Sequence, residues 1–292
     1  MKHTIRYVGD IHGRNAHFAI HDEKARDDGI RYIVQCGDLG VMYAPSRKDA
    51  DSWRRFRDIE GRVPPDNIAK RLMRTRAQEG SGPWPVWITC GGNHDNWPRW
   101  RRVSPPEGGD GLRELAPGLF FADRGTIVRI EGVEHLFFGG ARSTDAWRRI
   151  PGLSWWEEEL PTKPEVELFF DRMSERSPPV VVTHDCTVDA TPEGTRSIRN
   201  NNRLDDPLAK ELGKVLEACG HRPLLWAFGH HHAVSRETDE HGTEWLCCGW
   251  KRDYVDVTYQ IEDSVPPSVV NIETHQLDKP DLPMAPRPRK RR

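Results

Sequence analysis

The chain has 292 residues and a formal net charge of −2. A chain of this length can bury a full hydrophobic core, and it fits one large domain. The nearly neutral charge excludes a global basic field that would draw the protein to nucleic acid or to a membrane surface. The apolar residues occur in short runs, so no stretch approaches the ~20 apolar residues of a transmembrane helix. Residues 1–4 lack the apolar stretch of a secretion signal, and we expect a cytoplasmic protein.

Short runs of β-branched and aromatic residues recur along the chain, and each ends in a cluster of Gly, Asp, Asn or His. In chain order they cover residues 4–8, 31–35, 86–89, 136–138, 180–183 and 224–228. Runs bounded by such turn residues predict buried strands. Residues 16–28 and 207–218 predict helices, and 16–28 should cross between the first two strands.

The later part of the chain predicts more strand than helix. Further strands are expected at residues 126–130, 134–138, 244–248, 255–261 and 269–273. A second sheet should therefore pack against the first. The predicted fold is α/β of the layered α+β kind, a two-sheet β-sandwich flanked by helices.

One domain is expected over residues 1–274. Residues 41–85 are rich in Arg, Asp and Trp and poor in aliphatic residues, which predicts a helical insertion on the surface. Residues 275–292 are rich in proline and end in a basic run, which predicts a disordered tail.

The chain has 6 cysteines, and none form a C-x-x-C pair. A chain of this size without an export signal does not need disulfides, so reduced thiols are expected. Those at the ends of strand-like runs should behave as small apolar residues.

Potential metal ligands recur at the expected strand ends. They are Asp10, His12, Asp38, Asn93, His94, His184, His230 and His232. Loops at the carboxyl ends of strands are where α/β proteins place ligands. Imidazole suits transition metals, and carboxylate oxygen suits Mg²⁺, Mn²⁺ and iron. The lack of thiolates in this set argues against a structural zinc site. Two ions ~3.5–4 Å apart, joined by one carboxylate, can bind a phosphoryl group and activate water.

The motifs that carry these residues resemble the signature of the calcineurin-like metallophosphoesterases. They are Gly9-Asp-Ile-His-Gly13, Gly37-Asp38, Gly92-Asn-His-Asp95, His184 and Gly229-His-His-His232. Any one of them is weak evidence, but their order and their placement at strand ends match along residues 4–260. The run Gly139-Gly-Ala-Arg142, followed by Trp155-Trp156, is similar to small bacterial and phage members of phosphodiesterase type.

The resemblance implies a dinuclear metal site at the carboxyl ends of the strands. Its ligands would be Asp10, His12 and His232 for the first ion, Asn93, His184 and His230 for the second, and Asp38 as a bridge between the two. Mn²⁺ is the expected ion, with Fe, Zn²⁺, Ni²⁺ or Mg²⁺ as alternatives, because the bound ion depends on supply. A hydroxide that bridges the metals would be the nucleophile.

The same resemblance gives His94 and Asp95 roles outside the metal ligands. His94 would face the substrate and protonate the leaving group or stabilise its developing charge. Asp95 would orient the His94 ring from behind and fix its tautomer. Contacts to the substrate phosphate are expected from Arg14, Asn15 and Arg142, with helix capping as the alternative for Asn15.

The chain departs from the Ser/Thr protein phosphatases of this family after Asp38. Those enzymes carry G-D-x-V-D-R-G, whereas this chain reads Asp38-Leu-Gly-Val-Met-Tyr43 and has no matching arginine. A clamp of that kind would hold a phosphomonoester dianion. Its absence favours a phosphodiesterase that acts on small or nucleotide-like diesters, cyclic nucleotides included.

Three other functions stay open at this point. A phosphomonoesterase or protein phosphatase would use the same fold, and a binding scaffold would use the metals only for stability. The basic run at 286–292 and the 11 tryptophans leave nucleic acid open as a partner, since exposed aromatic rings can stack on bases. Core packing is the commoner role of tryptophan.

Overall fold

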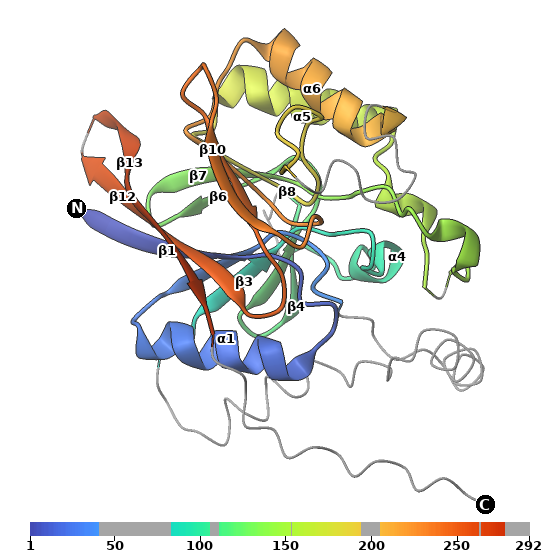
Figure 1. The fold of residues 1–292 in the computed structure, drawn as a ribbon, viewed down its shortest axis with the longest axis horizontal. Helices are drawn as coiled ribbons and strands as arrows, with labels where there is room; N and C mark the ends of the chain where they lie inside the picture. Colours follow the sequence, from blue (N-terminus) through green and yellow to red (C-terminus); the bar gives the residue numbers. More distant parts are fainter. Residues whose placement is uncertain (41–82, 106–110, 153, 194–204, 263, 278–292) are drawn as a thin grey trace, which may run out of the picture.

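Two β-sheets packed face to face form the centre of the computed structural model (Figure 1). The structure describes residues 1–40, 83–105, 111–152, 154–193, 205–262 and 264–277. The helices expected within the 41–85 insertion and the tail from residue 278 onward lie outside the described residues. Among the described helices, none is long and apolar enough to cross a membrane.

The first sheet has seven described strands in the order β13-β12-β1-β2-β3-β5-β4. Their bounds are β1 (Lys2–Val8), β2 (Tyr32–Gln35), β3 (Val86–Thr89), β4 (Leu112–Ala116), β5 (Leu119–Ala122), β12 (Asp253–Glu262) and β13 (Val265–Gln276). Strands β1, β2, β3 and β5 run parallel, and the other three pair antiparallel at the two sides. Helix α1 (Asn15–Asp27) makes the crossover from β1 to β2, as predicted.

The second sheet has six described strands in the order β10-β11-β9-β8-β7-β6. Their bounds are β6 (Thr126–Ile130), β7 (Val133–Phe138), β8 (Val180–Thr183), β9 (Leu225–Phe228), β10 (Val234–Thr238) and β11 (Glu244–Cys248). The central strands β7, β8, β9 and β11 run parallel. Between elements lie short helices α4 (Trp97–Trp100), η1 (Ala146–Arg148) and η2 (Glu157–Glu159).

Helices cover the outer face of each sheet. Figure 1 shows α1 against the first sheet, and α5 (Lys163–Arg176) and α6 (Pro207–Cys219) against the second. Phe18 of α1 packs with Trp87 of β3, whereas Phe169 of α5 packs with Phe138 of β7. Helix α5 begins with a capping box, in which Thr162 and Glu165 each bond the other's backbone. These layers confirm the predicted two-sheet sandwich flanked by helices.

Several predicted strands have the same first and last residues in the structure. Residues 86–89, 126–130, 180–183 and 244–248 form strands with the predicted bounds. Among the described residues, strands β4, β5 and β10, helix α5 and the short helices α4, η1 and η2 were not predicted. Strand β13 continues to Gln276 and Leu277 is buried, so the described chain stays packed two residues beyond the expected start of the tail.

The core between the sheets is mostly apolar, and a chain of hydrogen bonds runs through it. The hydroxyls of Tyr7 and Tyr259 are 2.7 Å apart, and the Tyr7 hydroxyl is 2.7 Å from Nε2 of His135. Nδ1 of His135 lies 2.9 Å from the carbonyl oxygen of Val133, so Nδ1 donates and Nε2 accepts from Tyr7. Burial lowers the pKa of His135 to about 4. This chain joins β1 and β12 of the first sheet to β7 of the second.

The parallel strands of both sheets deliver polar residues to one edge of the sandwich. Asp10 follows β1, Asp38 follows β2 and Asn93 follows β3, all in the first sheet. His184 follows β8 and His230 follows β9, both in the second. Because the carboxyl ends of parallel strands meet at one edge, the two sheets each supply part of the same group.

Candidate metal centre

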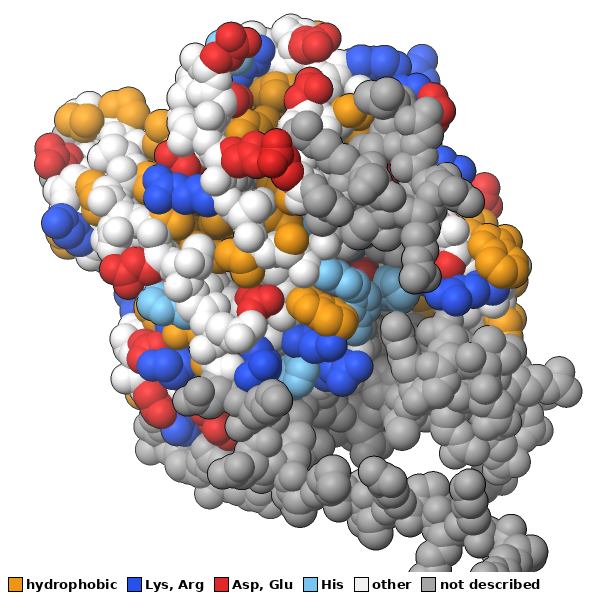
Figure 2. Space-filling model, in the orientation of Figure 1, with side chains coloured by type: hydrophobic (Ala, Val, Ile, Leu, Met, Phe, Trp, Pro, Cys, Tyr) orange, Lys and Arg blue, Asp and Glu red, His pale blue; other side chains and the backbone are white. Residues whose placement is uncertain are grey.

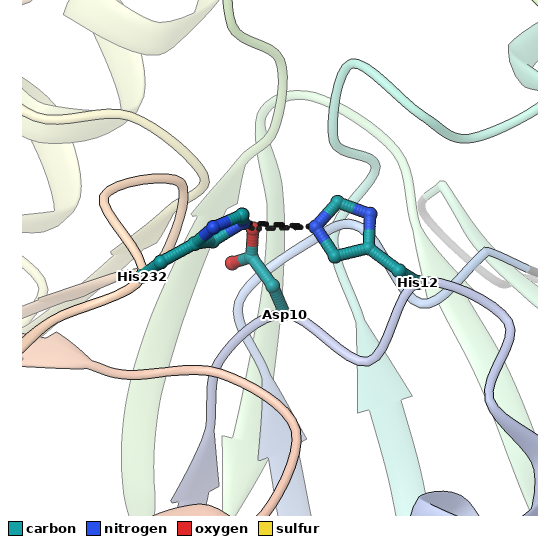
Figure 3. Close-up of side chains that lie close together, drawn as sticks. All are labelled: Asp10, His12 and His232. Carbon is teal, nitrogen blue, oxygen red and sulfur yellow. Dashed lines mark hydrogen bonds and ion pairs between the residues drawn. The ribbon is translucent and has the colours of Figure 1, made fainter. Parts of the chain in front are cut away.

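Three side chains converge beyond the end of β1. Nε2 of His232 lies 3.0 Å from Oδ2 of Asp10, and Nε2 of His12 lies 3.4 Å from the same oxygen. The two Nε2 atoms are 2.9 Å apart. Figure 3 shows the imidazole rings of His12 and His232 directed toward one another beside the Asp10 carboxylate. All three ligand atoms lie within 4.8 Å of one another, as binding of one metal ion requires.

A second group forms around His184. Its Nε2 lies 3.5 Å from Oδ2 of Asp38 and 3.1 Å from Oδ1 of Asn93. Its Nδ1 lies 2.7 Å from the carbonyl oxygen of Cys36, which fixes the proton on Nδ1 and turns Nε2 toward the site. Ligand atoms of Asp10, Asp38 and His184 also lie within 4.8 Å of one another.

Asp38 lies between the two groups. Its Oδ2 is 3.5 Å from Nε2 of His184, 3.7 Å from Nδ1 of His12 and 3.9 Å from Nε2 of His94. Its Oδ1 accepts a hydrogen bond of 2.7 Å from the backbone N–H of His94. A carboxylate in this position, with histidines on both sides, suits a bridge between two ions.

The side chain of His230 makes fewer close contacts with the other expected ligands than those ligands make with one another. Its backbone N–H donates to Oδ1 of Asp10 at 2.8 Å, and its ring lies 5.1 Å from the ring of His184, centroid to centroid. The neighbouring His231 turns away, with Nε2 3.2 Å from Asp185 and 3.4 Å from Sγ of Cys186. This is the alternation expected for the sequence His230-His-His232.

Several of these residues adopt left-handed backbone conformations, which only glycine adopts without strain. The φ angles are 52° at His12, 55° at Asp38, 64° at His230 and 55° at His232. Strained backbone of this kind persists where the surrounding structure holds it, and it clusters at functional sites. The surrounding fold therefore stabilises the strained turns that position these side chains.

Glycines allow the close approach of the chain at the site. A Cβ on Gly92 would collide with Asp38, and a Cβ on Gly229 would lie 2.5 Å from Oδ1 of Asp10. Both carboxylates thus lie directly against backbone that carries no side chain. This requirement accounts for glycine at these places in the motifs.

The charges at the site favour bound cations. Burial would raise the pKa of Asp10, but His12 and His232 outweigh it and hold that pKa well below its ordinary value. Burial would lower the pKa of His184, but the carboxylate of Asp38 outweighs it and raises the pKa to about 10. The buried carboxylates that hold a proton on His184 would likewise hold a metal cation.

The residues fit a divalent metal. Oδ2 of Asp10 is buried and, within the described residues, accepts no hydrogen bond of normal geometry, although two histidine nitrogens lie close to it. A metal ion would satisfy this oxygen and both nitrogens together. Oxygen and imidazole donors of this kind suit Mn²⁺, Fe and Zn²⁺.

His94 lies at the open side of the group, and an arginine that the sequence did not single out contacts it. The His94 side chain is 21 % exposed. Nη2 of Arg149 lies 2.6 Å from Nε2 of His94, and since a guanidinium can only donate, Nε2 accepts. Figure 2 shows histidine side chains gathered on one face of the molecule, and the His232 side chain of this group is 40 % exposed.

Asp95 does not make the contact expected of it. It is fully buried, and its two carboxylate oxygens accept hydrogen bonds of 2.7 and 2.8 Å from the backbone N–H groups of Gly40 and Gly92. Neither oxygen bonds the His94 ring. Burial and the charge of Asp38 raise the pKa of Asp95 to about 7. The Asp95 side chain therefore connects the loops after β2 and β3. The predicted contact between Asp95 and the His94 ring is corrected accordingly.

The amide of Asn93 is oriented by two further residues. Its Nδ2 donates to Oγ of Ser143 at 3.1 Å, and that hydroxyl donates to Oε2 of Glu159 at 2.5 Å. Glu159 is buried and also accepts from the Ser143 backbone N–H at 2.8 Å. Because Nδ2 is held in this way, Oδ1 of Asn93 faces His184 and the site.

The contacts of Arg14, Asn15 and Arg142 with the substrate phosphate stay predictions. Arg14 is exposed at the N-cap of α1 and makes no side-chain cap, and Asn15 is the first helical residue rather than the cap. Arg142 is exposed. Trp97 and Trp100 are fully buried, as core packing predicts, whereas Trp147 is 86 % exposed.

The chain matches one known family along most of its length. A family model described as calcineurin-like phosphoesterase matches residues 3–234. The chain belongs to the calcineurin-like phosphoesterase family. No curated protein matches the sequence significantly. The calcineurin-like fold and the grouping of aspartates and histidines at its sheet ends agree with the sequence-based assignment.

Solved structures show the same fold at low sequence identity. A protein assigned as a 5′-nucleotidase from Staphylococcus aureus is 14 % identical with a TM-score of 0.53, over 98 % of this chain and 56 % of that one. The protein TT1561 of Thermus thermophilus is 14 % identical with a TM-score of 0.51, over 94 % of this chain and 99 % of that one. GAP50, the anchor in the inner membrane complex of Plasmodium, is 11 % identical with a TM-score of 0.50, over 95 % of this chain and 90 % of that one.

Membership in the calcineurin-like phosphoesterase family makes metal-dependent phosphoester hydrolysis the activity class of this site. When bound, two divalent ions supply Lewis acidity and a nucleophile derived from water at neutral pH. The aspartates and histidines around Asp38 would hold such ions, and His94 lies at the exposed side of this group.

Proposed function

We propose that the protein is a dinuclear-metal phosphodiesterase that acts on small or nucleotide-like diesters, cyclic nucleotides included. The observation that carries this proposal is Asp38, which lies between one group with Asp10 and His12 and another with His184. Such a carboxylate would bridge two ions. Mn²⁺ is the expected metal, with Fe, Zn²⁺, Ni²⁺ or Mg²⁺ as alternatives set by supply.

Each residue has a definite task in this proposal. Asp10, His12 and His232 would hold one ion, and Asn93, His184 and His230 would hold the other. His94 would act on the ester oxygen that departs, either by donating a proton or by stabilising charge. With Nε2 accepting from Arg149, the neutral ring carries its proton on Nδ1, so proton donation from Nε2 requires Arg149 to shift.

A diester is favoured by the chemistry near Asp38. The residues that follow, Leu39 and Gly40, are apolar or lack a side chain, and the phosphatase-type arginine is missing there. A diester carries one negative charge, whereas a monoester dianion needs more cationic contacts. The second candidate is therefore a phosphomonoesterase, and the guanidinium of Arg149 beside His94 is the observation that favours it.

The test is the turnover of bis-p-nitrophenyl phosphate against p-nitrophenyl phosphate by protein loaded with each metal in turn. The proposal expects higher kcat/KM for the diester, and activity on 2′,3′- or 3′,5′-cyclic nucleotides would define the substrate further. A clear preference for the monoester would favour the second candidate. Metal-loaded protein that hydrolyses neither ester would instead be a binding scaffold.

A further inference from the structure

We propose that Arg149 binds a phosphoryl oxygen of the substrate. This inference rests on the proposed function only in that the site binds a phosphoryl group, which both the diesterase and the monoesterase candidates require. Arg149 directly follows η1, in the segment that connects β7 to α5. No motif in the sequence marks it, and it lies in a different part of the chain from the arginine of the protein phosphatases.

The position of the guanidinium places it at the reacting side of the site. Nη2 is 2.6 Å from Nε2 of His94, and that nitrogen is 3.9 Å from Oδ2 of Asp38. Nη1 lies 3.3 Å from the carbonyl oxygen of Asn93 and 3.5 Å from that of Ser154. The guanidinium thus contacts two consecutive residues of the loop after β3, Asn93 and His94.

The buried guanidinium of Arg149 has one anionic partner, and its terminal nitrogens could bind a second anion. The Arg149 side chain is only 3 % exposed, and the carboxylate of Asp145 lies 2.6 Å from its Nε. Nη2 meets a neutral imidazole nitrogen, a weaker partner for a buried cation than an anionic oxygen. A phosphoryl oxygen would replace that partner with a charge-assisted hydrogen bond.

The planar fork of arginine suits this task. Guanidinium groups match phosphate oxygens in pairs and remain charged at all physiological pH values. Asp145 and the two carbonyl oxygens hold the fork in place before substrate binds. Binding of the phosphoryl group by Arg149 would also release Nε2 of His94 to face the leaving group.

The experiment compares Arg149→Ala, Arg149→Lys and wild type, each loaded with Mn²⁺. Inorganic phosphate is the probe, and its affinity is measured by calorimetry and as inhibition of ester hydrolysis. Loss of a charge-assisted contact should weaken phosphate binding about 10- to 100-fold in the alanine variant, with partial retention in the lysine variant. Mn²⁺ content should stay that of the wild type, because Arg149 is not a ligand.

The matched control is Arg148→Ala. Arg148 is the adjacent residue, its side chain is 58 % exposed, and it pairs with the same Asp145. This variant should bind phosphate as the wild type does. If Arg149→Ala also binds phosphate within twofold of the wild type, Arg149 only braces the loop and the proposal is wrong.

Two further outcomes separate this proposal from the one it rests on. If wild type hydrolyses neither ester, the proposed function fails, but calorimetry with phosphate still decides on Arg149. If the alanine variant does not fold, as judged by its melting curve, Arg149→Lys decides alone. Wild-type phosphate affinity and wild-type KM in the lysine variant, whose ammonium cannot form the fork, would then overturn the proposal.

Discussion

The side-chain amide of Asn93 offers a sharp test of how this site is held together. Its Nδ2 donates to the Ser143 hydroxyl, which in turn donates to the buried carboxylate of Glu159. Ser143→Ala removes the middle member without touching any expected ligand. The amide could then rotate and withdraw Oδ1 from the ion that it is proposed to bind.

The expected loss of metal affinity follows from the position of Ser143, which contacts the proposed ligand Asn93 but is not itself a proposed ligand. Removal of hydrogen-bond partners that orient metal ligands lowers metal affinity about 10- to 100-fold. This corresponds to about 1.4–2.7 kcal/mol of binding free energy for one ion. The Glu159 carboxylate keeps its hydrogen bond from the Ser143 backbone, so the fold itself should lose less.

The assay is calorimetric titration of metal-free protein with Mn²⁺. Wild type should show two binding events, and Ser143→Ala should weaken one of them selectively. Ser154→Ala is the control, because Ser154 is also buried in this segment but its hydroxyl bonds the backbone of Ile150. Equal Mn²⁺ affinities for wild type and Ser143→Ala would refute the reasoning.

Other predictions concern the reacting group, the bridge and the core. His94→Ala should keep its metal content and lose about 10²–10⁴-fold in kcat, and loss of metal from this variant would show that His94 is a ligand. Asp38→Asn should lower the occupancy of both metals in elemental analysis, and loss of one alone would argue against a bridge. The pKa of His135 is about 4 when folded against about 6.5 when unfolded, so the unfolded chain binds the proton more tightly. The stability of metal-free protein should therefore be greatest above pH 6.5 and fall toward pH 4, by at most ~1.4 kcal/mol per pH unit from this residue. His135→Gln should flatten this slope in urea unfolding, and an unchanged slope would count against the assignment.

The fold could be predicted where short apolar runs end in turn residues. Strands β3, β6, β8 and β11 are of this kind, and their bounds agree with the structure. Other elements carry weaker signals. The sequence of β4, Leu-Arg-Glu-Leu-Ala, has residues that favour helix as readily as strand, and β10 is an exposed polar strand at the sheet edge. Helix α5 did carry a local signal, the capping box of Thr162 and Glu165.

The residues of the site likewise fall into those that sequence motifs identify and those that they do not. The motifs place the expected ligands at strand ends, and the sheets then bring Asp10, Asp38 and His184 together. Residues that act through tertiary contacts are invisible to motifs. Arg149 reaches His94 only because the segment after β7 folds back over the site, and Asp95 turns toward Gly40 rather than toward the neighbouring ring.

The origin of the ligands in two different sheets has a consequence for the whole domain. A metal ion held by Asp10 and His232, or by Asp38 and His184, would connect the sheets as a cross-link does. Metal affinity then depends on how closely the sheets pack, and the packing depends on the metal. A cavity made deep in the apolar interface would be expected to weaken metal binding at the edge, where no ligand has changed. Metal affinity would thus report on distant packing, and selection for activity would act on the core as well as on the motifs.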